Sequence, residues 1–273
     1  MKRILKTLCT ILILAISPMA AAAQENIAER EEDLAKQAQN PIANLISLPF
    51  QNNTNFGISE NDRTQNILNV QPVIPFKLSK DLNLITRWII PLVSQPDIQQ
   101  ESGSTFGLGD INPSFFFSPD TGDMVWGFGP TFTLPTATSK KTGSGKWGAG
   151  PSVVGVYTNG PWLAGFLINN IWTFGGDGKR PDGSKMLVQP FVNFNLPDGW
   201  YLTTSPVFTA DWKANADNRW SVPLGGGIGK LTVFQGFPPI NFQIQGFGNV
   251  VTPDDSGPEG SLRVQVQLLF PKG

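Results

Sequence analysis

Histidine is absent from this chain of 273 residues, and cysteine occurs once, at position 9. Without histidine the chain cannot form a Ser-His catalytic pair, an Asp-His protease pair or the usual histidine-ligated zinc site. Cys9 lies in a segment that we expect to be removed, so we expect neither thiol chemistry nor a disulfide in the mature chain. The sequence therefore predicts a protein that is not an enzyme and has no cofactor and no metal site.

Charge is the second scarce property. Only 15% of the residues are charged, which is low for the surface of a soluble protein of this size. The chain has 20 basic and 21 acidic residues, and removal of Lys2, Arg3 and Lys6 with a leader leaves 17 against 21, a net charge of −4. No basic run stands out, so we expect no nucleic-acid partner.

Long apolar runs are also missing, apart from one near the start of the sequence. This run, residues 8–16, follows three basic residues and is followed by Pro18 and by the small residues Ala21–Ala23. The pattern is typical of a secretory signal peptide, and the run is too short to span a bilayer. We predict a cleaved signal peptide at 1–23 and export into the envelope of a two-membrane bacterium.

The next segment, 24–41, is rich in acidic residues and in helix formers, and Pro41 ends it. We interpret it as a short periplasmic helix or a disordered segment; a functional plug is the less favoured alternative. The remaining residues, 42–273, are predicted to form one all-β domain, because about 250 residues suit a single domain of this class.

The clearest strand pattern lies near the C-terminus, at Ser261–Phe270. Apolar residues occupy one parity and polar residues the other, so a strand here has one apolar and one polar face. Similar segments of roughly ten residues recur along the chain, separated by Gly, Asp, Asn, Pro and Ser clusters. The twelve predicted segments are 45–57, 65–77, 83–94, 106–117, 124–135, 146–157, 161–173, 185–196, 200–211, 219–230, 239–250 and 261–270.

The connections between these segments alternate between short and long, apart from a longer connection at 231–238 where a short one is expected. Short turns follow the second, fourth, sixth and eighth segments, whereas long polar loops fall at 95–105, 136–145, 174–184, 212–218 and 251–260. Bacterial outer-membrane barrels show this asymmetry, with short periplasmic turns and long external loops. We therefore predict an antiparallel transmembrane β-barrel of about 12 strands. The alternative is an exported soluble sandwich, in which the apolar faces would meet in a dry core.

Two further features favour the barrel, and one opposes it. Most tryptophans stand near segment ends, where two aromatic girdles would place them, and charged residues gather in the long loops. Against this, seven prolines fall near the middle of segments, where proline cannot donate to a strand ladder. We expect some of them to mark bulges. These prolines are Pro72, Pro113, Pro130, Pro151, Pro190, Pro206 and Pro223.

Three stretches resemble a known family: Asn40–Thr54, Gly103–Phe117 and Asn195–Leu202. They are similar to motifs of the outer-membrane barrels named for the meta-pathway of phenol degradation, often labelled transporters and sometimes neuromedin U. The resemblance covers nearly all of 40–270. It implies an outer-membrane β-barrel and, from the family's name, transport of small aromatic or apolar compounds.

By parity, a small set of polar and ionisable side chains is expected to face the interior. Such groups inside a membrane protein either line a solute path or satisfy one another in a plugged interior, and both hypotheses stay open. A barrel of twelve strands suits a narrow passage rather than an open porin. The candidate pore-lining residues are Arg87, Asp110, Asn112, Gln189, Asp211 and Arg263.

The sequence thus predicts a protein of the bacterial outer membrane that gives small molecules, aromatic or apolar ones included, a narrow passage. The alternative function is a structural or surface ligand-binding barrel with a sealed lumen. The expected partners are outer-membrane lipids and lipopolysaccharide, the barrel-assembly machinery and a small-molecule solute.

Overall fold

The structure is a computed structural model that describes residues 30–100, 102–119, 124–234, 236–254 and 257–271. The predicted signal peptide at 1–23, the first residues of the charged segment and the turn at 120–123 lie outside the described residues. Among the described residues, no helix is long and apolar enough to cross a membrane.

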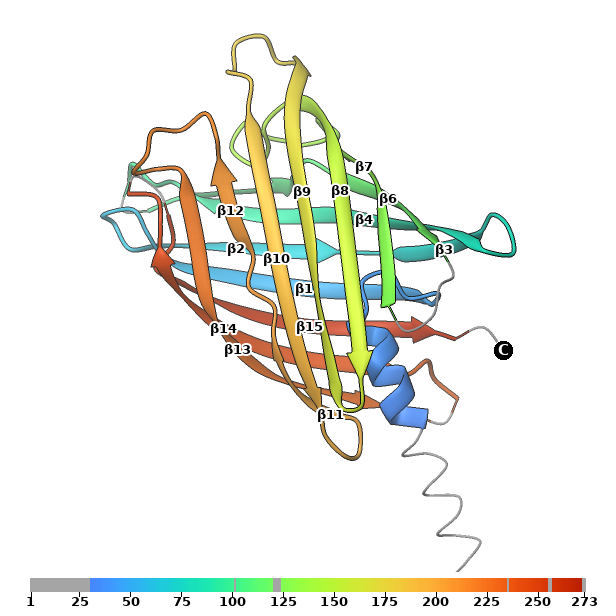
Figure 1. Ribbon diagram of the computed structural model, residues 1–273. Helices are drawn as coiled ribbons and strands as arrows, with labels where there is room; N and C mark the ends of the chain where they lie inside the picture. The colour runs from blue at the N-terminus through green and yellow to red at the C-terminus, as the bar shows by residue number, and fades with distance from the viewer. Residues whose placement is uncertain (1–29, 101, 120–123, 235, 255–256, 272–273) are drawn as a thin grey trace, which may run out of the picture.

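All described strands belong to one antiparallel sheet (Figure 1). The last strand pairs with the first along its whole length, from Ile46 opposite Phe270 to Phe56 opposite Gly260, so the sheet closes into a barrel. The strands are β1 (Ile46–Ile58), β2 (Arg63–Val70), β3 (Val73–Lys77), β4 (Leu82–Pro96), β5 (Ser104–Leu108), β6 (Asn112–Pro119), β7 (Met124–Thr133), β8 (Lys146–Asn159), β9 (Trp162–Gly176), β10 (Ser184–Asn195), β11 (Trp200–Thr204), β12 (Phe208–Asp211), β13 (Trp220–Thr232), β14 (Ile240–Val251) and β15 (Gly260–Phe270).

In three places, two consecutive short strands lie end to end and together form one longer strand of the barrel, here called a ribbon. β2 and β3 both pair with β1 and β4, β5 and β6 both pair with β4, and β11 and β12 both pair with β10 and β13. Counting each pair once gives a barrel of twelve ribbons, which confirms the predicted fold class. The sandwich alternative is wrong, because a single sheet closes on itself instead of two sheets packing face to face.

The interruptions account for some of the prolines in mid-ribbon. Pro72 separates β2 from β3, Pro206 lies between β11 and β12, and Pro223 stands where the register of β13 against β14 shifts. Since proline has no N–H to donate, a break or bulge lets the ladder resume beyond it. Pro130, Pro151 and Pro190 instead lie within continuous strands, and nothing in the structure explains their recurrence.

The connections lie at two ends of the barrel, as the sequence predicts. One end, here called the turn end, carries the short connections 78–81, 160–161 and 196–199 and the longer 233–239. The other, the loop end, carries 97–103, 134–145, 177–183, 212–219 and 252–259, together with a short connection at 59–62. In the turn 196–199, Asp198 and Gly199 have φ values of 59° and 72°, a conformation typical of tight hairpins.

The outer face of the barrel is apolar and carries two aromatic bands. Large hydrophobic side chains such as Phe166, Ile228 and Ile244 are exposed on it. Trp126, Trp162 and Trp200 lie near the turn end, whereas Trp147, Trp172, Trp212 and Trp220 lie at the loop end. Indole rings collect at both surfaces of a bilayer, so this distribution is the one expected of a membrane barrel.

The N-terminal segment packs against the turn end of the barrel. Residues 30–39 form a helix, drawn beside the ends of β8 and β15 in Figure 1. Its Leu34 and Ala35 are buried against the strand ends, in what we call the mouth cluster. The mouth cluster consists of Leu34, Ala35, Ala43, Leu45, Leu231 and Leu269. Full burial of one leucine stabilises a contact by about 1.5–3 kcal/mol, so the helix is a docked part of the fold.

The interior differs from the expectation in one respect. We expected the polar residues that face inward to be mostly amides and hydroxyls, but the inner wall also carries a buried apolar cluster. The lumen apolar cluster consists of Ile42, Val73, Ile85, Phe116, Val154, Val156, Leu163, Leu167 and Phe191. Ile42 lies between the helix and β1, so the chain that follows the helix covers part of this apolar wall.

Candidate functional site

Two cavities lie in the interior of the barrel. The first, the inner chamber, has a volume of about 120 Å³ and is covered on one side by Ala38–Pro41 of the N-terminal segment. The second, the vestibule, has a volume of about 1020 Å³ and is lined in part by the loops at 177–183 and 212–219. The vestibule lies toward the loop end and the chamber lies toward the helix, so the two follow one another along the barrel.

Part of the lining of the inner chamber is apolar. Val73, Leu167 and Phe191 line it, from β3, β9 and β10, and all three belong to the lumen apolar cluster. Val73 pairs with Arg87 and Leu167 pairs with Gln189 on the neighbouring strands, and paired residues point to the same face of the sheet. Phe191 lies two residues after Gln189 and therefore also faces inward.

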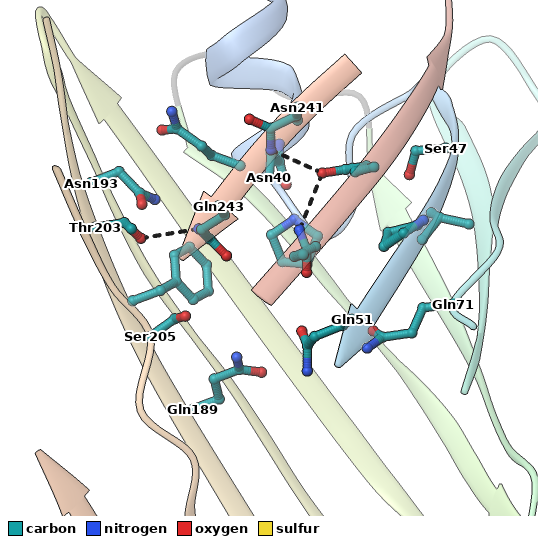
Figure 2. Close-up of a pocket in the computed structure, with 18 of the residues that line it drawn as sticks. Asn40, Ser47, Gln51, Gln71, Gln189, Asn193, Thr203, Ser205, Asn241 and Gln243 are labelled. Atoms are coloured by element: carbon teal, nitrogen blue, oxygen red, sulfur yellow. Dashed lines mark hydrogen bonds between the residues drawn. The ribbon is translucent and has the colours of Figure 1, made fainter. Parts of the chain in front are cut away.

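Most of the remaining lining is a wall of amides and hydroxyls (Figure 2). Several of these groups bond to one another. The Tyr201 hydroxyl donates to Asn241 Oδ1 at 2.8 Å, Asn241 Nδ2 donates to Gln267 Oε1 at 3.2 Å, and Gln243 Nε2 donates to Thr203 Oγ1 at 3.3 Å. Because these polar groups satisfy one another, this wall is fixed in place.

Two amides in the chamber behave differently. Among the described residues, the side chains of Gln189 and Asn193 form no hydrogen bond, although both line the chamber. Asn193 is only 4% exposed. These two side chains present unused donors and acceptors to whatever occupies the chamber.

Arg87 and Arg263 are the two arginines of the barrel interior. Arg87 Nη2 donates to Gln71 Oε1 at 2.7 Å. Arg263 donates from Nε to Asn53 Oδ1 at 3.0 Å and from Nη1 to the Ser205 carbonyl at 2.9 Å. Within the described part of the chain, none of the ion pairs includes either arginine. Both positive charges are therefore held by neutral groups.

The vestibule contains charges of both signs that are mostly paired or bonded. Asp110 accepts hydrogen bonds from Ser144 Oγ at 2.6 Å and Ala137 N at 3.3 Å, which anchors the loop 134–145. Lys146 Nζ lies 2.9 Å from Asp182 Oδ1. Asn112 donates to Thr133 Oγ1 at 2.9 Å, and Asp211 Oδ2 lies 3.8 Å from Lys185 Nζ.

Ion pairs and hydrogen bonds also join the outer loops to one another. Lys141 Nζ donates to Asp97 Oδ2 at 3.0 Å, and this hydrogen bond lowers the pKa of the Asp97 carboxyl below its usual value. Arg180 donates to the carbonyls of Gly143 and Lys140, so the loops 134–145 and 177–183 are tied together. Among the described residues, no cluster of three carboxylate, histidine or cysteine side chains could hold a metal ion.

The six residues singled out from the sequence fall into separate places. Arg87 and Gln189 line the inner chamber. Asp110, Asn112 and Asp211 line the vestibule, and Arg263 sits in the amide network between Asn53 and Ser205. Their role in lining a pore stays a prediction.

The sequence analysis missed the apolar part of the chamber lining and its cover. Phe191 shares the parity of Gln189 and Asn193, so the same alternation could have placed it inside. No sequence pattern that we used could have placed Asn40 and Pro41 over the chamber, because their position depends on how the preceding helix docks.

These features together define a class: a closed antiparallel β-barrel of the outer-membrane type, with twelve ribbons and cavities inside. In fold the chain is similar to an outer membrane channel from Pseudomonas putida F1, with a TM-score of 0.63 and 15% identity over 83% of this chain and 94% of that one. It also aligns with the NanC porin, with a TM-score of 0.48 and 10% identity over 82% of this chain and 98% of that one. For the CymD monoaromatic hydrocarbon channel the TM-score is 0.45, with 9% identity over 84% of this chain and 88% of that one.

Neither a family model nor a curated protein matches the sequence. At 15% identity the first of these likenesses establishes the fold and no more. The resemblance to the family named for phenol degradation therefore stays a prediction.

Proposed function

We propose that this protein lies in the bacterial outer membrane and gives small molecules a narrow passage across it. The observation that carries the proposal is the tandem of cavities inside a closed barrel, a vestibule of about 1020 Å³ followed by a chamber of about 120 Å³. The apolar outer face and the two tryptophan bands support a place in the bilayer, in contact with lipids and lipopolysaccharide after insertion by the barrel-assembly machinery.

The size of the chamber limits what can pass. A barrel of about eight strands is filled by its own side chains, whereas sixteen or more leave an open channel. Twelve ribbons with a small chamber fit a narrow and selective path. The apolar wall of Val73, Leu167 and Phe191 supports solutes with an apolar part, which agrees with the aromatic or apolar class that the family resemblance implies.

Solute uptake into liposomes that contain the purified barrel tests the proposal. We expect small organic solutes to enter faster than into protein-free liposomes. Arg87→Ala and Arg263→Ala should change the ratio of anionic to neutral solute flux, because each removes a positive charge from the interior. The control is Lys80→Ala, which removes an exposed positive charge from the turn 78–81 and should leave this ratio unchanged. Absence of flux with a correctly folded wild-type barrel would contradict the proposal.

A second candidate function, a ligand-binding barrel with a sealed lumen, has one observation in its favour. The N-terminal segment covers the chamber, and the amides behind it bond to one another. Replacing the loops 134–145 and 177–183 separates the two functions. Loss of surface binding in a barrel that never shows flux would favour the sealed barrel.

A further inference from the structure

The inner chamber has the properties of a binding site and not only those of a section of a path. Its walls come from both ends of the sequence: Ala38–Pro41 cover one side of it, and Gln265 and Gln267 of β15 also line it. The cover is held in place by the mouth cluster and by a hydrogen bond of 2.7 Å from Gln39 Nε2 to Asn195 Oδ1. A molecule in the chamber therefore contacts both the barrel wall and the N-terminal segment.

The lining of the chamber can contact different parts of a molecule. Val73, Leu167 and Phe191 offer an apolar surface to a hydrocarbon group. Beside them, on β10, Gln189 and Asn193 flank Phe191, and their side-chain amides form no hydrogen bond among the described residues. This lining suits a ligand with an apolar body and at least one polar group.

Arg87 favours a negative charge on the polar group of the ligand. It lines the chamber, its hydrogen bond goes to the neutral Gln71, and in the described chain it takes part in no ion pair. The other charged groups of the interior do not compensate it. Arg263 is also positive, and Asp110 and Asp211 lie in the vestibule with partners of their own. An anionic ligand would supply the missing charge, in the planar geometry that guanidinium groups bind best.

The volume of the chamber suits an apolar body of one ring. The chamber measures about 120 Å³. A buried apolar cavity of about 150 Å³ binds benzene, so a single six-membered ring matches the size of this chamber.

We propose that the inner chamber binds a single-ring organic anion, with its ring against Val73, Leu167 and Phe191 and its anionic group on Arg87. The proposal names the class of solute for the passage described above and rests on that function for its biological meaning, but the binding itself does not require flux.

Titration calorimetry of the full barrel in detergent tests the proposal, with benzoate as the probe and benzyl alcohol as its neutral counterpart. We expect wild-type protein to bind benzoate with one site per barrel and benzyl alcohol more weakly. Arg87→Gln should weaken benzoate binding by about tenfold or more, because it removes a charge-assisted hydrogen bond, and should leave benzyl alcohol nearly unaffected. Phe191→Ala should weaken both ligands.

Lys80→Gln serves as the control, since it removes a positive charge from the exposed turn far from the chamber lining and should not change either affinity. Each variant is first shown to be folded by its mobility shift on heating. No benzoate binding by the wild type, or equal benzoate affinity in Arg87→Gln, would overturn the proposal. Binding without flux would contradict the passage and keep the site, whereas flux without binding would contradict the site and keep the passage.

Discussion

At the scale of single residues, the contact between Tyr201 and Gly229 shows how tightly the interior is built near the turn end. Tyr201 is fully buried, and a Cβ placed on Gly229, its neighbour across β11 and β13, would lie 2.1 Å from the tyrosine ring. Only glycine leaves room for that ring, which in turn places the tyrosine hydroxyl on Asn241.

We therefore expect Gly229→Ala to destabilise the folded barrel by about 1–3 kcal/mol, the usual cost of overpacking a well-filled interior. Gly246→Ala on the neighbouring strand β14 is the matched control, because a Cβ there meets nothing within 4 Å. The measurement is the temperature at which each variant loses its folded mobility on a detergent gel. An equal temperature for both variants would show that the ring can move aside.

The alternation of side chains along single strands predicts which residues face the interior of the barrel. Arg87, Gln189 and the alternation of β14 and β15 could be placed from the sequence, because successive strand side chains point to opposite faces. Parity says which residues share a face, but not what stands opposite. The apolar wall of Phe191 and Leu167 escaped prediction because an apolar residue fits either a lipid face or a packed interior.

At the scale of elements, the N-terminal segment is the part that the sequence described least well. Its acidic helix formers predicted a helix or a disordered lead-in, and docking depends on a small number of residues such as Leu34, only 5% exposed. Glu31 also accepts a hydrogen bond of 3.0 Å from Val233 N, in the connection between β13 and β14. Neither contact is marked by a periodic sequence pattern, whereas each strand repeats its alternation of apolar and polar residues over many positions.

We expect the segment to control access to the chamber from the turn end. In the double variant Gln39→Cys and Asn195→Cys, a short thiol-reactive cross-linker with a reducible bond would hold the segment over the chamber, since the native side chains are within hydrogen-bond distance. Solute flux into liposomes should fall on cross-linking and return on reduction. The single variant Gln39→Cys treated with the same cross-linker is the control. Unchanged flux in the cross-linked barrel would show that solutes bypass the segment.

The interrupted ribbons are the second feature of this scale. The sequence predicted each of them as one segment, at 65–77, 106–117 and 200–211, and the structure keeps the ribbon but divides it. Prolines 72 and 206 explain two of the divisions, because a residue without an N–H ends a ladder locally. The break between β5 and β6 has no proline in it, so composition alone could not have located it.

At the scale of the whole molecule, the apolar outer face predicts that lipid hydrocarbon surrounds the middle of the barrel. Val153 lies near the middle of β8, points outward and is 44% exposed, whereas Tyr157 lies on the same face near the strand end and is 52% exposed. Arginine on a lipid face costs about 2–4 kcal/mol at the bilayer midplane and about 0–1 kcal/mol near the interface.

We thus expect Val153→Arg to destabilise the barrel in lipid bilayers by about 2–4 kcal/mol and Tyr157→Arg to do so by about 1 kcal/mol or less. Denaturant titration in liposomes of defined thickness measures both. Equal and small effects would mean that the middle of this face is not surrounded by hydrocarbon. The comparison needs no assumption about transport.

The pairing of β15 with β1 has a consequence for how the molecule is made. Residues such as Arg263 and Asn53 meet across this seam although they are 210 positions apart in the chain. Contacts between such distant segments form slowly, because a long loop must close first. Until the final ribbon has been synthesised and delivered, the nascent sheet has two unpaired edges, and each can associate with the wrong chain. We therefore expect a newly made chain to stay prone to aggregation until β15 has paired with β1.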